Sequence, residues 1–285
     1  MASLISSYGI VKSSSGKLCY EQEGNKDGPA VLFIHGLGGT TNTYQPLVSS
    51  LQDFHLVRFD WAGHGRSSVP QKTSIDSYVE DAEGKCQSTK AIPEPCQQMA
   101  AVIKYFDLKD ATVVEHSLGC LVAMTLAAKQ ASLLSRLILY GPVKSLPQAG
   151  RDGAKGRAEN VRKGGMATMA DTVIGNAFAA GTLKDRPKTV AFGRELLCRQ
   201  DAEGYALVFL ALAESKDPDW SAIKAQTTII SGSEDKVSTP ALCKIIAEFL
   251  GHTTVNLVTF EGVGHWHTLE NSSESEKVLK NAVKS

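Results

Sequence analysis

Residues 111–120 read ATVVEHSLGC and join a β-branched run to a helical run through a turn that holds a serine. Thr112 to Val114 suit a buried strand, because branched side chains pack well on a pleated surface. From Leu118 onward, apolar residues recur at helical spacing. Ser117 therefore points its hydroxyl away from both elements, and the amides at the start of the new helix can hold negative charge.

The composition is ordinary for a soluble globular protein. The chain has 285 residues, of which 42% are hydrophobic and 21% charged, and its 30 basic and 30 acidic residues cancel. No long block of one charge occurs, so we expect neither nucleic acid nor an acidic membrane surface as a partner. No window approaches the roughly 20 apolar residues that span a bilayer. Residues 1–8 lack the pattern of a secretory signal, and we expect a cytoplasmic protein.

Strand and helix patterns alternate along most of the chain. Short apolar runs such as Ala30–Ile34 and Arg136–Tyr140 are typical of strands buried on both faces of a parallel sheet. The alternation predicts an α/β fold with a mostly parallel central sheet flanked by helices. It breaks over residues 143–220, where helical patterns occur without a strand. We therefore expect a core of residues 1–142 and 221–285, with 143–220 inserted after the sixth strand as a helical cap. A polar, irregular excursion is expected over residues 70–93.

A serine hydroxyl becomes a good nucleophile when a base takes its proton and an acid orients that base. Asp235 follows the strand pattern of residues 227–230 and is the predicted acid; its neighbour Glu234 is the alternative, and helix capping is a structural role that either could have. His265 follows the last strand pattern and is the predicted base, with His267 as its competitor.

The oxyanion formed during acyl transfer needs backbone N–H donors that are fixed in advance. One predicted donor is the amide of Leu118, directly after the nucleophile. The other is expected from the glycine-rich turn of residues 35–39, at Leu37.

No cofactor or metal site is expected. The spacing of His, Cys and Asp residues matches no common metal-ligand pattern, and the glycine-rich turn lacks both phosphate-binding signatures. His55, His252 and His267 look peripheral, whereas His35 and His64 are expected to brace turns. The six cysteines are expected to be reduced thiols, although Cys86 and Cys96 could pair if oxidised.

At these landmarks the chain resembles the α/β-hydrolase superfamily, whose nucleophile elbow usually reads G-x-S-x-G. The matching segments are residues 35–39, 60–67, 116–119, 232–240 and 264–265. Within the superfamily, the pattern of residues 162–213 is similar to the lid of the 3-oxoadipate enol-lactonase-like group. Three departures stand out: Glu115 replaces the first glycine of the elbow, Ala62 replaces a usual arginine, and residues 78–93 are longer than usual. A side chain as large as Glu115 should crowd a neighbouring strand or helix.

The resemblance implies a serine hydrolase that cleaves a lactone or carboxylic ester of a small molecule through an acyl-enzyme on Ser117, as a monomer or homodimer. Two alternatives stay open. The same triad could cleave a carbon–carbon bond or close a ring in biosynthesis, or the chain could be a ligand-binding protein on a hydrolase scaffold. Four side chains near the motifs are candidates for substrate binding, although core packing is the more common role for such residues: Trp61, Met166, Phe178 and Trp266.

Overall fold

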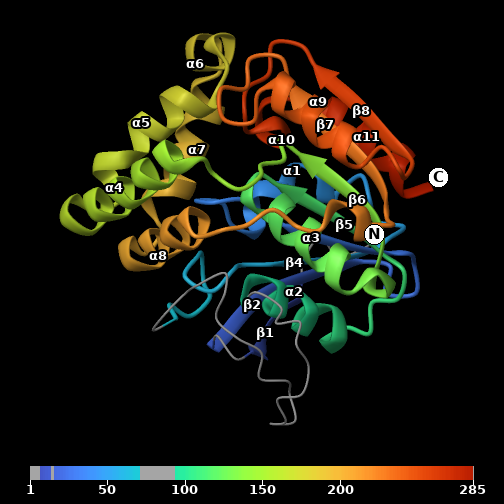
Figure 1. Ribbon diagram of the computed structural model, residues 1–285. Coiled ribbons are helices and arrows are strands. Elements are labelled where there is room, and N and C mark those ends of the chain that lie inside the picture. Colours follow the sequence, from blue (N-terminus) through green and yellow to red (C-terminus); the bar gives the residue numbers. More distant parts are fainter. Residues whose placement is uncertain (1–6, 14–15, 71–93, 285) are drawn as a thin grey trace.

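An eight-stranded sheet forms the centre of the computed structural model, which describes residues 7–13, 16–70 and 94–284. Its strands are β1 (Ser7–Ser13), β2 (Gly16–Gly24), β3 (Ala30–Ile34), β4 (His55–Phe59), β5 (Ala111–His116), β6 (Leu134–Tyr140), β7 (Gln226–Gly232) and β8 (Val255–Phe260). They lie in the order β1-β2-β4-β3-β5-β6-β7-β8 (Figure 1). The pairs β1–β2 and β2–β4 are antiparallel, and from β4 to β8 all neighbours are parallel.

Helices cover both faces of this sheet. They are α1 (Gln45–Val48), α2 (Glu94–Tyr105), α3 (Leu118–Lys129), α9 (Pro240–Phe249), α10 (His267–Glu270) and α11 (Ser272–Lys284). Short 3-10 turns occur at Thr41–Tyr44, Ala131–Leu133 and Trp220–Ala222.

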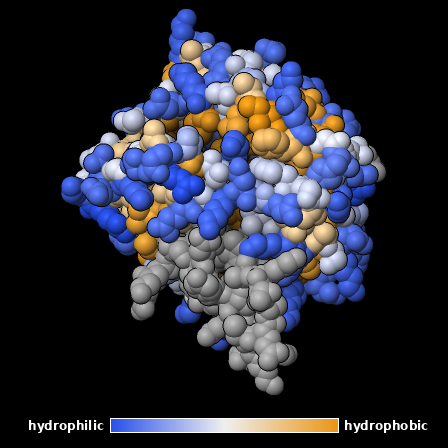
Figure 2. Space-filling view, in the orientation of Figure 1, coloured by the Kyte–Doolittle hydropathy of each residue, from blue (hydrophilic) through white to orange (hydrophobic). Residues whose placement is uncertain are grey.

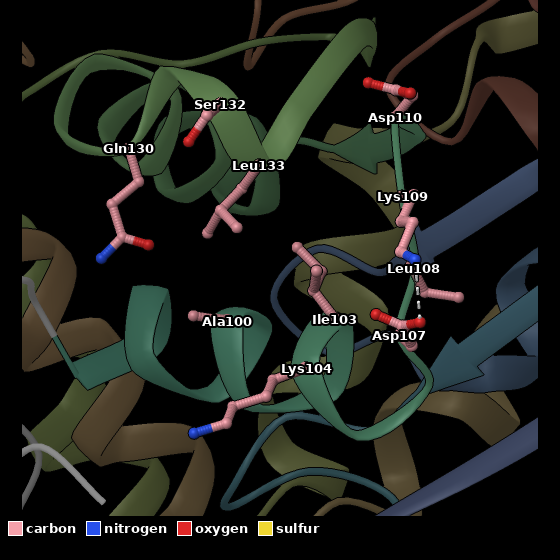
Figure 3. A pocket seen from close by; sticks show the side chains of 10 residues that line it. All are labelled: Ala100, Ile103, Lys104, Asp107, Leu108, Lys109, Asp110, Gln130, Ser132 and Leu133. Atoms are coloured by element: carbon pink, nitrogen blue, oxygen red, sulfur yellow. Dashed lines mark ion pairs between the residues drawn. The ribbon is translucent and has the colours of Figure 1, made fainter.

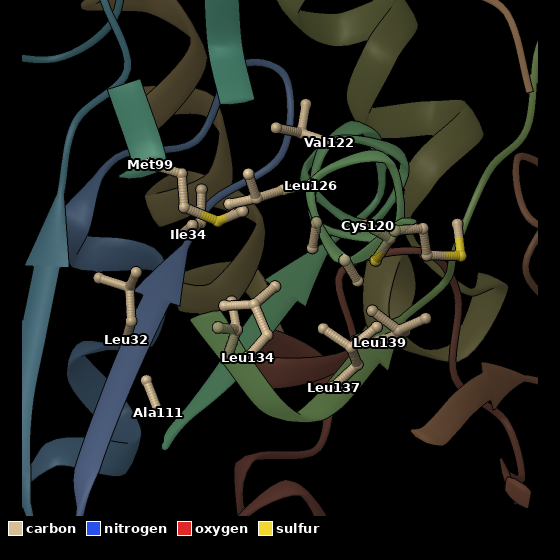
Figure 4. Packing of buried hydrophobic residues seen from close by; sticks show 14 of the residues in the cluster. Leu32, Ile34, Met99, Ala111, Cys120, Val122, Leu126, Leu134, Leu137 and Leu139 are labelled. Carbon is tan, nitrogen blue, oxygen red and sulfur yellow. The ribbon is translucent and has the colours of Figure 1, made fainter. Parts of the chain in front are cut away.

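Alternating side chains of β3 show how the sheet is buried on both faces. Leu32 and Ile34 belong to an apolar cluster with α2, α3 and α9, part of which is drawn in Figure 4. Val31 and Phe33 belong to the opposite cluster, with α1 and α11. Since neighbouring residues of a strand point to opposite faces, a continuous apolar run is what a doubly covered strand requires. The predicted α/β fold with a mostly parallel sheet is confirmed.

Five helices follow β6 before the chain returns to the sheet at β7. They are α4 (Gln148–Gly164), α5 (Ala167–Ala177), α6 (Ala180–Asp185), α7 (Pro187–Cys198) and α8 (Ala202–Ala213), and they gather on one side of the sheet in Figure 1. Apolar residues at helical spacing, such as Ala154, Ala158 and Val161 of α4, give them a buried cluster of their own. Trp266, from the turn after β8, belongs to the same cluster and links the five helices to the sheet.

One strand was not predicted from the sequence, and one predicted segment lies outside the described residues. Ser7–Ser13 is largely exposed, so it lacks the apolar pattern that indicates a strand. It forms strand β1 by pairing with β2. The excursion predicted for residues 70–93 lies almost wholly outside the described residues, and so does Cys86 of the possible cysteine pair. The cysteines at positions 19, 120, 198 and 243 are free.

Candidate active site

Ser117 lies at a sharp turn between the central strand and the helix that follows it. Strand β5 ends at His116 and helix α3 begins at Leu118, so a single residue makes the turn, with φ 54° and ψ −117°. A residue other than glycine in such a sparsely populated backbone conformation costs on the order of 1–3 kcal/mol, and residues of this kind cluster at functional sites. The Ser117 amide donates to the carbonyl of Tyr140 at 2.9 Å, which fixes the turn against β6.

Three side chains from three strand ends form one hydrogen-bonded relay. The Ser117 hydroxyl donates to His265 Nε2 over 2.8 Å, and His265 Nδ1 donates to Asp235 Oδ2 over 2.7 Å. All three side chains are buried, with Ser117 the most exposed at 9%. The structure thus brings together three residues that are far apart in the sequence. Glu234 points elsewhere, because its Oε2 accepts from the amide of Ala180.

The carboxylate of Asp235 is held by the loop that carries it. Its Oδ1 accepts from the amides of Val237 and Ser238 at 2.7 and 2.8 Å, which leaves Oδ2 for His265. Burial would raise the pKa of this carboxyl, but His265 and the donated hydrogen bonds outweigh burial and hold the pKa below its ordinary value. Asp235 therefore stays ionised and can stabilise a protonated imidazole at His265.

Several other histidines surround the relay as neutral groups. His116 Nε2 donates to the backbone carbonyl of His265 at 2.8 Å, and burial lowers its pKa well below the ordinary value. Burial likewise lowers the pKa of His267 to about 4. The interpretation of His267 as peripheral is wrong, since this side chain is fully buried and lies beside Asp235. Sequence spacing gave no signal for that burial.

The two residues predicted to supply the oxyanion donors line the same cavity as Ser117. Leu37 and Leu118 both line it, and neither amide has a hydrogen-bond partner among the residues that the structure describes. The turn that carries Leu37 is braced, since the next amide, at Gly38, donates to His64 Nε2 at 3.2 Å. A Cβ on Gly36 would lie 2.9 Å from the carbonyl oxygen of His116. Glycine is needed there because the turn lies directly against the elbow.

The cavity over Ser117 has a volume of about 750 Å³ and lies between the strand ends and helices α4, α5 and α8. Its apolar walls include Leu118, Met169, Phe209 and Trp266. The charged side chains that line it are all cations: Lys144, Arg157 and Lys236.

Three of the four predicted substrate-binding side chains do not line this cavity, and the prediction for them is corrected. Trp61 is buried in the sheet cluster and donates from Nε1 to the carbonyl of His35. Met166 and Phe178 pack inside the cluster of helices α4 to α8. Trp266 does line the cavity. Helical or turn spacing shows that a large apolar side chain is buried, but not whether it faces a cavity or a packed cluster.

Glu115 is accommodated beneath the elbow because the residue above it is glycine. Its side chain is fully buried, and a Cβ on Gly119 would lie 2.5 Å from its Oε2. Neither carboxyl oxygen has a hydrogen-bond partner among the described residues, and burial raises the pKa of this carboxyl well above its ordinary value. Burial without a hydrogen-bond partner therefore favours the protonated, neutral form of Glu115.

Another cavity, of about 540 Å³, lies between α2 and the turn after α3 (Figure 3). Among its lining side chains, Lys109 and Asp107 form an ion pair at 3.4 Å, and no histidine or cysteine contributes. The described lining thus lacks a serine–histidine or cysteine–histidine pair of the kind found over Ser117. Over the described ranges, no group of His, Cys, Asp and Glu side chains is arranged to hold a metal ion.

Hydrophilic residues cover most of the coloured part of the face seen in Figure 2, and hydrophobic residues occupy smaller areas between them. Within the part of the chain that the structure describes, none of the helices is both long and apolar enough to cross a membrane.

Comparison with known proteins adds to this geometry. A family model described as "Alpha/beta hydrolase family" matches residues 31–278. The chain is 27% identical over 243 residues to 3-oxoadipate enol-lactonase 2 of Acinetobacter baylyi, which covers 85% of this chain and 84% of that protein. It is 23% identical over 279 residues to 3-oxoadipate enol-lactonase 1 of the same organism, over 97% of both.

Two solved structures illustrate the likeness in fold. An enol-lactonase from Burkholderia xenovorans superimposes with a TM-score of 0.85 and 22% identity, over 97% of this chain and 100% of that one. A thermophilic esterase from Thermogutta terrifontis gives a TM-score of 0.84 and 19% identity, over 98% of both. At these identities the likeness shows the shared fold alone.

Proposed function

We propose, since this chain belongs to the alpha/beta hydrolase family, that it hydrolyses a lactone or carboxylic ester of a small organic molecule through an acyl-enzyme on Ser117. The observation that carries the proposal is the relay from Ser117 through His265 to Asp235, with both hydrogen bonds below 3 Å. The names of the relatives, enol-lactonase and esterase, point to the same class of bond.

The first half of the reaction forms the acyl-enzyme. Ser117 Oγ attacks the carbonyl carbon of the ester while its proton passes to His265 Nε2, and Asp235 stabilises the resulting imidazolium. The amides of Leu37 and Leu118 donate to the oxygen that becomes negative, where a fixed donor is worth on the order of 3 kcal/mol. Collapse of the tetrahedral intermediate breaks the bond to the leaving oxygen, which takes the proton from His265.

The second half repeats these steps with water. His265, again neutral, removes a proton from water as the water oxygen attacks the acyl carbon, and the proton then returns to Ser117 Oγ as the acid leaves. For a lactone, the leaving oxygen stays tethered to the acyl group and one hydroxy acid is released. Helices α4 to α8 act in this proposal as a cap that keeps bulk water from the cavity.

The charges around the cavity favour a substrate that carries a carboxylate. Lys144, Arg157 and Lys236 line it, and no acidic side chain does so among the described residues. Lys144 is partly neutralised by Asp217 at 3.6 Å, and Arg157 lies over the ring of Phe209. The net positive charge at the cavity would attract and orient an anionic ester or lactone.

The test replaces the proposed nucleophile. Ser117→Ala should lower turnover of 4-nitrophenyl esters and of a lactone panel by on the order of a thousandfold or more, while circular dichroism and Tm stay those of a folded protein. Ser273→Ala, on the exposed start of α11, is the matched control and should leave turnover unchanged. A fluorophosphonate probe should label the wild-type protein and spare the Ser117→Ala variant.

Undiminished turnover in Ser117→Ala would contradict the proposal. If no probe labels Ser117 and no ester or lactone is cleaved, but a small ligand raises Tm, the chain is a binding protein on this scaffold instead. Product analysis by mass spectrometry separates ester cleavage from carbon–carbon cleavage or ring closure.

A further inference from the structure

Glu270 is a buried carboxylate that the reaction described above does not use. It ends the short helix α10, five residues after His265, and its side chain does not line the cavity. Only 2% of the residue is exposed. A carboxylate removed from water in this way is costly unless its oxygens are well supplied with hydrogen-bond donors.

Four donors converge on the two carboxylate oxygens of Glu270. Oε1 accepts from the amides of Gly264 at 3.1 Å and Trp266 at 3.3 Å, which are the residues on either side of His265. Oε2 accepts from the amide of Ala179 and the hydroxyl of Thr182, both at 2.9 Å. The second pair belongs to the junction between α5 and α6, so one side chain joins the turn that carries the base to the helices over the cavity.

This pattern requires a carboxylate and not merely a polar group. An ionised carboxylate has two acceptor oxygens, whereas the amide of glutamine has one acceptor oxygen and one donor group. In a glutamine variant the NH₂ group would therefore face one of the two pairs of donors. Either the turn around His265 or the junction of α5 and α6 would lose both of its hydrogen bonds.

The backbone of His265 is held by further contacts of the same kind. Its amide donates to the carbonyl of Ala177 at 2.6 Å, and its carbonyl accepts from His116 Nε2 at 2.8 Å. Together with Glu270, these contacts bind the peptide groups before, at and after the base. The groups that make these contacts lie close together in the sequence, since Ala177 ends α5, Ala179 lies between α5 and α6, and Thr182 is in α6.

We propose that Glu270 is a positioning residue, which fixes the backbone of His265 at hydrogen-bond distance from Ser117 and fastens that backbone to the helices over the cavity. This role rests on the proposed hydrolysis at Ser117. Glu270 touches neither substrate nor the reacting atoms and acts through His265. Misplacement of a catalytic group by about 1 Å can lower a rate on the order of a hundredfold, so loss of Glu270 should reduce kcat and leave substrate binding nearly intact.

The experiment measures kcat and KM for 4-nitrophenyl butyrate in Glu270→Gln and in Glu234→Gln. The second variant is the matched control, because Glu234 also accepts from the α5–α6 junction, at Ala180, but its side chain makes no hydrogen bond to the turn around His265. We expect kcat of Glu270→Gln to fall by about thirtyfold or more with KM within about threefold of wild type. Glu234→Gln should stay within about twofold of wild type in both constants.

A second set of variants, made in the His265→Ala protein, separates a positioning role of Glu270 from general destabilisation of the fold. Residues that act as a unit have non-additive effects, so Glu270→Gln should change the residual rate of the His265→Ala protein by less than about twofold. Tm is measured for each protein, so that all rates are compared well below unfolding. If Glu270→Gln does not fold, Glu270→Asp replaces it: both oxygens remain but are drawn back by one methylene, and kcat should still fall by at least about threefold at unchanged KM.

Three results would overturn the positioning role. The first is a kcat of the glutamine variant, or of the aspartate variant in its place, within about threefold of wild type. The others are a fall in kcat/KM that comes mainly from a higher KM, and an equal fall in rate in the His265→Ala background. A wild-type protein without Ser117-dependent turnover would instead overturn the proposed function and this role with it.

Discussion

His267 Nε2 lies 3.9 Å from Asp235 Oδ2, the same oxygen that accepts the hydrogen bond from His265. The distance is too long for a hydrogen bond, and neither ring nitrogen of His267 has a partner among the described residues. The ring packs beside those of Tyr140 and Phe260 instead. Since burial lowers the pKa of His267 to about 4, a neutral imidazole stands next to the acid of the relay.

The buried neutral state of His267 predicts a loss of stability in acid. The unfolded chain takes up a proton on this histidine near pH 6.5, whereas the folded protein resists it down to about pH 4. The contribution of neutral His267 to the free energy of unfolding is therefore fully present above pH 6.5 and is lost as pH falls toward 4. The slope is at most about 1.4 kcal/mol per pH unit. Urea unfolding of wild type and His267→Phe across this range should show a shallower pH dependence in the variant. His252→Gln, at an exposed turn, is the control and should keep the pH dependence of wild type. Equal slopes of unfolding free energy against pH in wild type and His267→Phe would contradict the prediction.

Glu115 predicts a pH dependence of the opposite sign. Burial raises the pKa of its carboxyl in the folded protein. The contribution of Glu115 to stability is therefore fully present below the pKa of the unfolded chain, about 4.3. It is lost as pH rises toward the pKa of the folded protein, because the carboxyl ionises more easily in the unfolded chain. Glu115→Gln cannot ionise, so its free energy of unfolding relative to wild type should increase from pH 5 to pH 8. Urea unfolding at both values measures this, with Glu274→Gln at the surface as control; a constant difference would argue that Glu115 is ionised.

Local patterns in the sequence were sufficient to predict the central part of the fold. The apolar run of Ala30–Ile34 and the turn at Ser117 each fix a strand end through side-chain branching and backbone geometry that depend on few neighbours. The resemblance to the α/β-hydrolases is confirmed by the family match. The catalytic roles of Ser117, Asp235 and His265 and the division into core and cap remain predictions, supported by the geometry.

Contacts made over long sequence distances could not be predicted. The side chain of Glu270 accepts hydrogen bonds from four donors, and two of these lie about 90 residues earlier, at Ala179 and Thr182. No rule of sequence spacing relates Glu270 to these two residues. Met166 and Phe178 show the same limit, since their periodicity indicates burial without indicating against what. Strand β1 depends on pairing with β2, which a mostly exposed sequence does not signal.

Gly36 predicts an effect of a single methyl group on catalysis. A Cβ there would lie 2.7 Å from His116 Nδ1, 2.9 Å from His116 O and 3.0 Å from Ser117 Cβ. Gly36→Ala should push the turn that carries Leu37 away from the elbow and lower kcat for a 4-nitrophenyl ester on the order of a hundredfold, because the oxyanion donor is displaced. Gly156→Ala, where a Cβ meets nothing within 4 Å, should keep wild-type kcat and gain about 0.5–1 kcal/mol of stability. Wild-type kcat in Gly36→Ala would remove Leu37 from the proposed oxyanion site.

Asp235 predicts a large loss of kcat when one carboxylate oxygen is replaced by an NH₂ group. Asparagine keeps the size of the side chain, but an amide nitrogen that faces His265 Nδ1 favours the wrong tautomer of the imidazole. Because Val237 and Ser238 donate to Oδ1, the asparagine oxygen should occupy that position and its NH₂ group should face the histidine. Asp235→Asn should lower kcat on the order of 10³–10⁴-fold, measured with the same ester at constant Tm. A loss below about tenfold would show that another group orients the base.

The cations around the cavity predict a preference that depends on substrate charge. Mono-(4-nitrophenyl) adipate and 4-nitrophenyl hexanoate have acyl chains of equal length and differ in a terminal carboxylate, so their ratio of kcat/KM isolates the charge. Replacing Lys236 and Arg157 with glutamine should lower kcat/KM for the anionic ester on the order of tenfold at low salt, because each exposed cation contributes up to about 1 kcal/mol. The neutral ester should change by less than about twofold, and 0.5 M salt should shrink the difference. Equal losses for both esters would mean that these side chains shape the cavity and do not select charge. Wild-type rates for both esters in the double variant would rule out Lys236 and Arg157 and leave Lys144 as the remaining cation among the described lining residues.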